Sequence, residues 1–459
     1  MKSITDVIAG FCTEIDFDDL PTEVVEKAKV HILDSIGVEL AGSRREETKN
    51  LINLFEQLGG KAESTLITSK VKVPMASAAF VNGEMTHDCG LDDVHPNASL
   101  HPASVVFPSA LAAAEAEGAS GSSFITAVVL GYEVMLRVGE SIGPKALYNR
   151  GFHPTGICGA FGSTVAVGKL LGLSQHKLVM ALGIAGSQAG GLQEYLSDGA
   201  SVKRLHSAKA SQSGVLSAVL AKLGYTGPYT VMEGKNGFLK AYSVEPNISI
   251  LTTELRKEFK IMETGLKLYP CTRYIEPSIN IILGDLWENH QMDHRDIEKI
   301  TIYIFDAAIP IVVEPLEEKR RPINAFSAQF SLPYNVAAAI VKGKLTREEY
   351  TPDTIKDKDI LNLIDKIEVI SDPEMSKQYP ELWPTRIAIQ FKGGKKLVQE
   401  IHTAKGDPKN PVTLDEVIEK FSNLAKPVFT KNRAEEIIET VLNLEKLNNI
   451  ASLGNLLRK

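Results

Sequence analysis

Polar and apolar side chains alternate along Lys299-Ile300-Thr301-Ile302-Tyr303-Ile304-Phe305. A period of two residues predicts a β-strand, because successive side chains of a strand point to opposite faces of its sheet. The same period recurs at 366–370 and 386–391. Gly393-Gly394, between the last of these and 396–402, predicts a hairpin turn, since glycine accepts the positive φ angles of short hairpin loops. We therefore predict an α+β domain over 265–408.

The chain before this domain has the pattern of consecutive helices. From Val24 to Leu40 apolar residues recur at helical spacing, and Gly42 follows as a stop signal. Segments rich in Ala, Gly, Ser, Leu and Val predict further helices at 103–118, 123–141, 156–172, 177–189 and 207–224. We expect an all-helical domain over 1–264.

Helices return after the strands. Thr413-Leu414-Asp415-Glu416 is a capping box, and apolar residues recur at helical intervals from Ala434 to Leu447. We predict that 409–459 packs back on the first helical domain. A chain of 459 residues also exceeds the roughly 250–300 residues at which one core stops growing. The predicted fold class is mainly α, with a large all-helical domain built from both chain ends and a smaller α+β domain.

Composition excludes several classes of protein. With 44% hydrophobic and 23% charged residues the chain is of globular type, and a net charge of −7 gives no basic footprint for nucleic acid. The N-terminus lacks a signal peptide and no membrane-spanning run of uncharged residues is present, so we expect a cytoplasmic protein. The cysteines lack paired spacing and are expected to be core residues rather than disulfides or zinc ligands: Cys12, Cys89, Cys158 and Cys271.

Titratable residues are densest between Thr86 and Pro102. Three histidines and three aspartates fall there: His87, Asp88, Asp92, Asp93, His95 and His101. Imidazole titrates near neutrality and can take and return a proton, while a neighbouring carboxylate fixes its tautomer. One interpretation is a general acid/base site. The alternatives are a polar loop whose aspartates cap helices, and a metal site that begins at His87-Asp88.

Two predicted helix starts carry candidate anion-binding groups. His153 precedes Pro154, where free backbone N–H groups attract a carboxylate. Lys203, Arg204 and His206 gather at the start of another helix and concentrate positive potential there. The alternatives are a histidine that only caps a buried helix and an exposed basic run.

A fourth candidate segment runs from Gly265 to Arg273, at the junction of the two predicted domains. Interdomain junctions are common places for small-molecule sites, and Lys267 or Arg273 could hold a carboxylate there. The alternative is an ordinary hinge with solvated charges.

In this order, these segments resemble the MmgE/PrpD family, which contains 2-methylcitrate dehydratase, cis-aconitate decarboxylase and iminodisuccinate epimerase. The resemblance runs over essentially the whole chain and is carried by Ile32-Leu33-Asp34-Ser35-Ile36-Gly37, Asp92-Asp93 with His101-Pro102, Gly151-Phe152-His153-Pro154-Thr155, Lys203-Arg204-Leu205-His206, Gly224-Tyr225-Thr226-Gly227-Pro228 with Glu233-Gly234, and Lys267-Leu268-Tyr269-Pro270-Cys271. It implies a helical domain formed by both chain ends, an α+β lid domain, a homodimer, and activity with neither metal nor organic cofactor.

The resemblance also implies roles for single residues. His101 is the leading acid/base group, Asp93 orients the site, His153 is a second proton donor or a substrate ligand, and Lys203 and Lys267 hold substrate carboxylates. The remaining residues that we expect to bind substrate are Arg204, His206, Tyr269 and Arg273.

The chain departs from the family pattern in two places. Many members carry a histidine shortly after the Lys-x-Tyr-Pro-Cys segment, where this chain has Thr272 and Glu276. Aconitate decarboxylases have a tyrosine shortly before a segment like Arg320-Arg321-Pro322, and this chain reads Glu317-Glu318-Lys319 instead. A carboxylate at Glu276 or Glu318 that faced the pocket would repel a tricarboxylate, so a smaller or amine-bearing substrate stays open.

We expect a hydro-lyase that removes water from a small hydroxy polycarboxylate such as 2-methylcitrate. The alternatives are an isomerase that epimerises an α-carbon of a dicarboxylate, a cis-aconitate decarboxylase and an inactive binding scaffold. The replaced tyrosine makes decarboxylation the least favoured of the three activities.

Overall fold

The structure is a computed structural model that describes residues 2–87, 90–197, 199–286 and 293–459. Asp88 and Cys89, which the sequence analysis named, lie outside the described residues. Contacts divide the chain into unit 1, Met1–Leu266 with Thr413–Lys459, and unit 2, Lys267–Val412. The predicted fold class is confirmed: unit 1 is helical and is formed by both chain ends, and unit 2 combines helices with a sheet.

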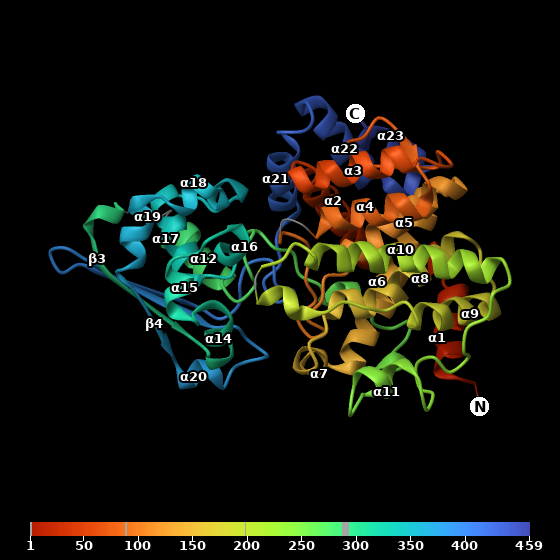
Figure 1. Cartoon of the computed structure of the whole chain (residues 1–459), viewed down its shortest axis with the longest axis horizontal. Helices are drawn as coiled ribbons and strands as arrows, with labels where there is room; N and C mark the ends of the chain where they lie inside the picture. Colours follow the sequence, from red (N-terminus) through yellow and green to blue (C-terminus); the bar gives the residue numbers. More distant parts are fainter. Residues whose placement is uncertain (1, 88–89, 198, 287–292) are drawn as a thin grey trace. The chain divides into compact units, whose positions relative to one another are not determined.

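Unit 1 is a packed assembly of helices. From the first part of the chain these are α1 (Ile4–Glu14), α2 (Thr22–Gly42), α3 (Glu46–Leu58), α4 (Met75–Thr86), α5 (Ala103–Glu117), α6 (Gly121–Ile142), α7 (Pro144–Asn149), α8 (Pro154–Leu170), α9 (Gln175–Gly186), α10 (Lys203–Lys222) and α11 (Phe238–Tyr242). The chain end adds α21 (Leu414–Ala425), α22 (Lys431–Leu442) and α23 (Ala451–Leu457). Its strands are the antiparallel pair β1 (Ser64–Thr65) and β2 (Lys72–Val73). In Figure 1 the blue C-terminal helices lie beside the orange N-terminal ones, and α21 packs against α2.

The centre of unit 1 consists of α5, α6, α8 and α10, which pack on one another. Their small residues allow close approach, because a Cβ on Gly159 would come within 3.0 Å of side chains on both α5 and α10. α6 is long and apolar enough to cross a membrane, but 89% of its most apolar window is buried in the structure, as is usual for the core helix of a globular protein.

Unit 2 contains a mixed four-stranded sheet in the order β4-β3-β5-β6. β3 (Ile297–Ile304) runs parallel to β4 (Ile367–Ser371) and antiparallel to β5 (Thr385–Phe391), which forms a hairpin with β6 (Lys396–Ile401). Both hairpin glycines have positive φ, +85° at Gly393 and +90° at Gly394. The period of two is confirmed, since Ile300, Ile302 and Ile304 are all buried in the core of unit 2.

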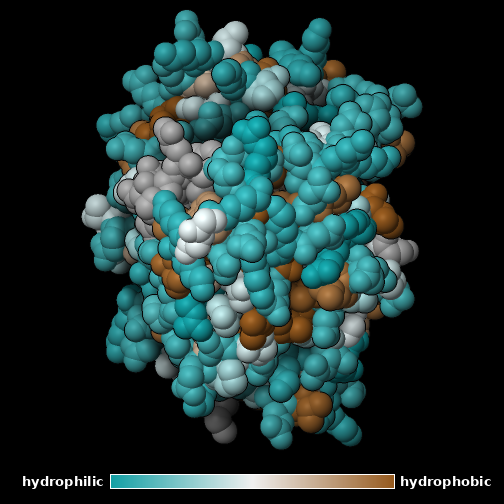
Figure 2. All heavy atoms as spheres, turned by 90° about the vertical axis from the view of Figure 1, so that its left-hand side faces the viewer, coloured by the Kyte–Doolittle hydropathy of each residue, from teal (hydrophilic) through white to brown (hydrophobic). Residues whose placement is uncertain are grey.

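Among the described residues of unit 2, the helices are short apart from α17. They are α12 (Glu276–Ile281), α14 (Ile309–Val312), α15 (Leu316–Arg320), α16 (Ala325–Gln329), α17 (Leu332–Lys342), α18 (Pro352–Ile355), α19 (Lys358–Ile364) and α20 (Pro373–Ser376). α12 packs against β5 and β6. The molecular face in Figure 2 carries mostly hydrophilic side chains, and hydrophobic ones gather in small groups between them.

Two predicted helix boundaries were wrong. The helix predicted to reach Leu447 ends at Leu442, and a short 3-10 turn follows over Leu444–Lys446. The helix predicted over 207–224 begins earlier, at Lys203, and the basic residues form its first turn, at the helix start where they were expected. Apolar spacing misses this start because the first turn is polar.

Candidate active site

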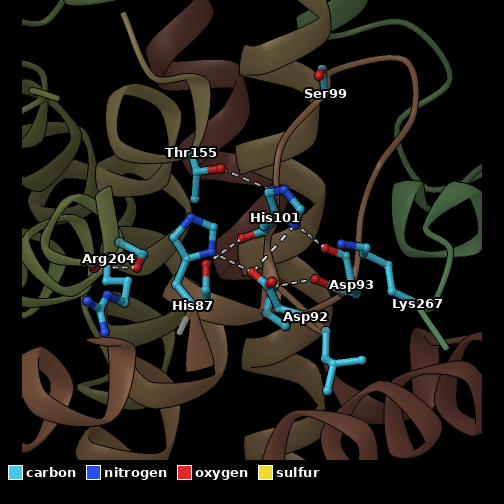
Figure 3. A network of polar contacts seen from close by, with 12 residues as sticks. His87, Asp92, Asp93, Ser99, His101, Thr155, Arg204 and Lys267 are labelled. Atoms are coloured by element: carbon cyan, nitrogen blue, oxygen red, sulfur yellow. Dashed lines mark hydrogen bonds and ion pairs between the residues drawn. The ribbon is translucent and has the colours of Figure 1, made fainter. Parts of the chain in front are cut away.

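The Asp92 carboxylate lies between two imidazoles. Its Oδ2 is 2.6 Å from Nδ1 of His87 and 3.4 Å from Nδ1 of His101 (Figure 3). Nδ1 of His101 also donates to the backbone carbonyl of Asp93, at 2.6 Å. Because a carbonyl and an ionised carboxylate only accept, both Nδ1 atoms carry a proton. In the neutral rings both Nε2 atoms therefore present a lone pair.

Local structure fixes both rings. His87 caps the C-terminus of α4, and His101 immediately precedes Pro102 at the N-cap of α5. The backbone N–H of His101 donates to Oγ1 of Thr155 in α8, at 3.1 Å. The His101 side chain is 21% exposed and that of His87 is fully buried. His101 is thus the accessible member of the pair and His87 the enclosed one.

Burial and charge set the protonation of this group. Burial opposes ionisation of Asp92, but the imidazoles of His101 and His87 outweigh it and hold the pKa of Asp92 well below its usual value. Burial lowers the pKa of His87, against the opposing effect of Asp92. Near neutral pH the site therefore contains a carboxylate and a neutral, buried His87.

The neighbouring Asp93 has a different environment. Its carboxylate accepts hydrogen bonds from the backbone N–H of Ala103 at 2.9 Å, from the Tyr132 hydroxyl at 2.8 Å and from Nδ1 of His31 at 2.9 Å. Burial raises the pKa of Asp93 to about 7, although two of these donors favour its ionised form. Asp93 thus caps α5 and reaches His101 through its backbone carbonyl.

Two more imidazoles, those of His153 and His206, follow His101 and His87, and the four rings form a row. Ring centroids are 5.2 Å apart for His101 and His87, 5.5 Å for His87 and His153, and 5.3 Å for His153 and His206. Nδ1 of His153 lies 3.2 Å from Nδ1 of His206, so one of the two donates to the other. Burial lowers the pKa of both rings, and the Lys203 charge acts in the same direction. His153 and His206 are therefore neutral near pH 7.

The loop before α10 holds this end of the row in place. The backbone N–H of His153, the N-cap residue of α8, donates to the Gly191 carbonyl at 3.0 Å. A Cβ on Gly156 would lie 2.6 Å from the Gly190 carbonyl oxygen and 3.0 Å from Cβ of His206. Glycine at position 156 is therefore needed for α8, the loop and His206 to approach one another.

The basic residues of α10 have different surroundings. Lys203 is the first residue of the helix, is half-buried, and its charge acts on His87, His153 and Asp92. The Arg204 guanidinium is buried beside Glu84, at 3.5 Å, and Glu47, at 3.9 Å. In Figure 3 Arg204 lies on the side of His87 away from Asp92. Lys203 is therefore the cation of this pair that acts on the imidazoles.

Three predicted substrate-binding residues belong to unit 2. Lys267 is buried and donates to the Cys271 carbonyl at 2.6 Å, and half-buried Tyr269 packs on the core of unit 2. Arg273 pairs with Glu276 and Asp407. Their roles stay predictions. Glu276 is buried against this arginine and Glu318 is exposed, so the charge of Glu276 is compensated within unit 2.

Two groups of side chains have ligand atoms close enough for a metal ion. His87, Asp92 and His101 form one. The 2.6 Å contact inside it is a hydrogen bond, since ligand atoms around an ion at about 2.1 Å lie roughly 3 Å apart. The other consists of His95, Glu140 and Glu263, between whose carboxylates the Lys260 ammonium lies at 3.1 and 2.8 Å. In this structure the first group is therefore hydrogen-bonded within itself, and the second surrounds an ammonium group.

Sequence reasoning missed three residues of this centre. It named His87 as a member of the 86–102 cluster and of the metal alternative but gave it no role of its own, and it gave no role to His31 and Tyr132 beside Asp93. The available signal for His31 was a histidine within the apolar helix 24–40. For Tyr132 there was none, because tyrosine is common in buried helices.

Residues 6–251 match the family model of the MmgE/PrpD N-terminal domain and residues 269–446 that of the MmgE/PrpD C-terminal domain. The chain belongs to the MmgE/PrpD family. This confirms the resemblance on which the residue roles rest. Within the MmgE/PrpD N-terminal match lie all four imidazoles of the row and Lys203.

Named relatives within the MmgE/PrpD family are decarboxylases and dehydratases. A cis-aconitate decarboxylase-like protein oryM of Aspergillus oryzae is 30% identical over 98% of this chain and 96% of its own length. The human cis-aconitate decarboxylase is 26% identical over 100% of this chain and 95% of its own. The 2-methylcitrate dehydratase of Salmonella typhi is 25% identical over 62% of this chain and 60% of its own.

Proposed function

We propose that this protein is a hydro-lyase that removes water from a small hydroxy polycarboxylate, with 2-methylcitrate as the reference substrate. The observation that carries the proposal is the pair His87 and His101 on one ionised carboxylate, Asp92. Elimination of water next to a carboxylate needs one group that takes a proton and another that gives one. Two imidazoles with a shared counter-ion supply both.

The reaction follows from these groups. A proton leaves the carbon next to a substrate carboxylate, the C–O bond of the β-hydroxyl breaks, a C=C bond forms and water departs. His101 exchanges a proton with the substrate, because its ring is the accessible one of the pair. Lys203 stabilises the negative charge that spreads onto the carboxylate when the C–H bond breaks. We assign His153 and His206 as ligands that hold the substrate. No step of this reaction needs a metal or an organic cofactor.

A second candidate is decarboxylation of cis-aconitate. It is favoured by the relatives that match nearly the full length of the chain, three of which in Aspergillus terreus and human bear that name. Glu317-Glu318-Lys319 in place of the expected tyrosine weighs against it. Decarboxylation of cis-aconitate needs a group that protonates the carbon from which CO2 leaves, and it needs no base.

One assay separates the two activities. The purified protein is incubated with 2-methylcitrate or with cis-aconitate, and ultraviolet absorbance and released CO2 are recorded. If absorbance rises with 2-methylcitrate and no CO2 is released, the hydro-lyase is supported. CO2 release from cis-aconitate alone would replace it with the decarboxylase. Isotope exchange in deuterated water without product would indicate an epimerase.

A further inference from the structure

One ring nitrogen of His87 has no partner within the part of the chain that the structure describes. Its Nδ1 is used by Asp92 at 2.6 Å, whereas its Nε2 is buried and has no hydrogen-bond partner among the described residues. A buried polar atom without a partner costs about 1–3 kcal/mol, so it calls for an explanation, of which a catalytic role is one. The contact with Asp92 uses only Nδ1 and therefore gives Nε2 no role.

The position of His87 links this nitrogen to the site. Its ring lies between those of His101 and His153, with centroids 5.2 and 5.5 Å away. The Asp92 hydrogen bond fixes the tautomer in which Nε2 carries the lone pair, as an acid–imidazole pair does in general-base catalysis. The ring of His101 shares the same carboxylate oxygen.

We propose that His87 is the base that takes the α-proton of the substrate on Nε2, while His101 gives its proton to the leaving hydroxyl. The inference rests on the proposed function. Before the reaction His101 is the imidazolium and His87 is neutral; afterwards the two states are exchanged, and Asp92 faces one positive charge throughout. The C–H and C–O bonds break, a C=C bond forms, and the proton from His101 leaves as part of water.

The surroundings agree with this division of labour. Burial keeps the enclosed His87 neutral, which a base requires. The partly exposed His101 lies within 3.4 Å of the Asp92 oxygen and donates to the Asp93 carbonyl, two contacts that stabilise its protonated form. A constant total charge also avoids the cost of changing charge inside unit 1.

The decisive experiment uses two substrates, 2-methylcitrate and the analogue in which fluorine replaces its tertiary hydroxyl. Fluoride leaves without being protonated. A variant that lacks the general acid should therefore still convert the fluoro analogue, whereas a variant that lacks the general base should not. His87→Asn keeps an N–H donor near Nδ1 for Asp92 and removes Nε2. We expect at least a ~100-fold lower kcat on both substrates. His101→Asn should reduce turnover of the hydroxy substrate far more than that of the fluoro analogue.

The matched control is His176→Asn, the same change on an exposed histidine that contacts Tyr229. It should leave turnover of both substrates within about two-fold of the unmodified protein. Normal turnover in His87→Asn would show that His87 only braces Asp92. A defect in His87→Asn confined to the hydroxy substrate would reverse the two roles. Either result overturns the inference.

A second measurement does not depend on catalytic activity. In 15N-histidine spectra of the unmodified protein at pH 7, one of the ten histidines should show a protonated Nδ1 and an unprotonated Nε2 that shifts when tricarballylate, a saturated tricarboxylate, is added. The signal is assigned as the one that disappears in His87→Asn or, if that variant does not fold, in His87→Gln. A protonated Nε2 overturns the inference. Inactivity of the unmodified protein on 2-methylcitrate contradicts the proposed function instead.

Discussion

Two adjacent aspartates have opposite surroundings in this protein. Asp92 faces imidazoles, and Asp93 faces the first turn of α5, Tyr132 and His31. The sequence indicated an acid/base cluster between residues 86 and 102, and the family resemblance singled out Asp93. Which aspartate faces the imidazoles depends on the path of the loop and on partners of Asp93 that lie 39 and 62 positions away. Local sequence carries no such information.

His101 is the first residue to test. His101→Ala removes the accessible imidazole and should lower kcat roughly 100-fold or more, as is usual for loss of a general acid or base. The thermal midpoint should change little, since the side chain is partly exposed. Unchanged turnover of the substrate would remove His101 from the mechanism.

Lys203 should act mainly in binding. Lys203→Ala takes away a positive charge at the start of α10, so KM should rise about ten-fold or more while kcat falls less. Lys209→Ala is the control, because Lys209 is an exposed lysine of the same helix whose ammonium group donates to Gln212. Steady-state kinetics measure both. A defect in kcat with normal KM would contradict the binding role.

Asp93 should make stability depend on pH. Burial raises its pKa from 3.8 to about 7, so the folded protein holds this proton more tightly than the unfolded chain. The contribution of this proton to the free energy of unfolding is fully present below about pH 4 and is lost as the pH rises to about 7. Asp93→Asn, which cannot titrate, should show a smaller loss of unfolding free energy over this range. Urea denaturation at several pH values provides the measurement, and parallel curves for the two proteins would contradict the assignment.

At the level of elements, long periodic segments were predictable and short ones were not. The helix at 24–40 and the strand at 299–305 are found as α2 and β3, because each repeats its period over several residues. Unit 2 also contains helices of four to six residues such as α14 and α12, which are too short to show a helical period. Their formation depends on tertiary packing, which composition does not encode.

The contact between α8 and α10 carries the imidazole row. A Cβ on Gly214 of α10 would clash with Ser163 of α8. Gly214→Ala should therefore push the helices apart, lower the unfolding free energy by about 1–3 kcal/mol and reduce turnover as His153 and His206 separate. Gly190→Ala, at an exposed glycine with open space around its Cβ position, should be nearly neutral. Calorimetry and activity together check this, and equal effects of the two changes would refute it.

At the level of the whole molecule, the last helices support the site. Lys420 of α21 forms a buried ion pair with Asp34 at 2.6 Å and donates to the Leu91 carbonyl at 3.0 Å, one residue before Asp92. The sequence predicted that the chain end packs on the helical domain. It could not predict this contact, because the two partners are 386 and 329 positions away from Lys420 (420 − 34 and 420 − 91).

Removal of this lysine charge should affect both stability and turnover. Lys420→Met leaves Asp34 as a buried, unpaired carboxylate, which typically costs about 3 kcal/mol or more, and frees the loop before Asp92. Lys426→Met, at an exposed lysine just after the same helix, is the control. Thermal denaturation and kcat are measured together. Full stability and activity in Lys420→Met would show that the chain end is not needed to hold the loop.

The division of unit 1 between the two chain ends has a consequence during synthesis. While the ribosome translates residues 267–412, the apolar side of α2 that α21 later covers stays open, and the Leu91 carbonyl lacks its lysine. A nascent or prematurely terminated chain that lacks Thr413–Lys459 already contains every residue of the imidazole row but not the support beneath it. Such fragments should be targets for chaperones and proteases rather than weakly active enzymes.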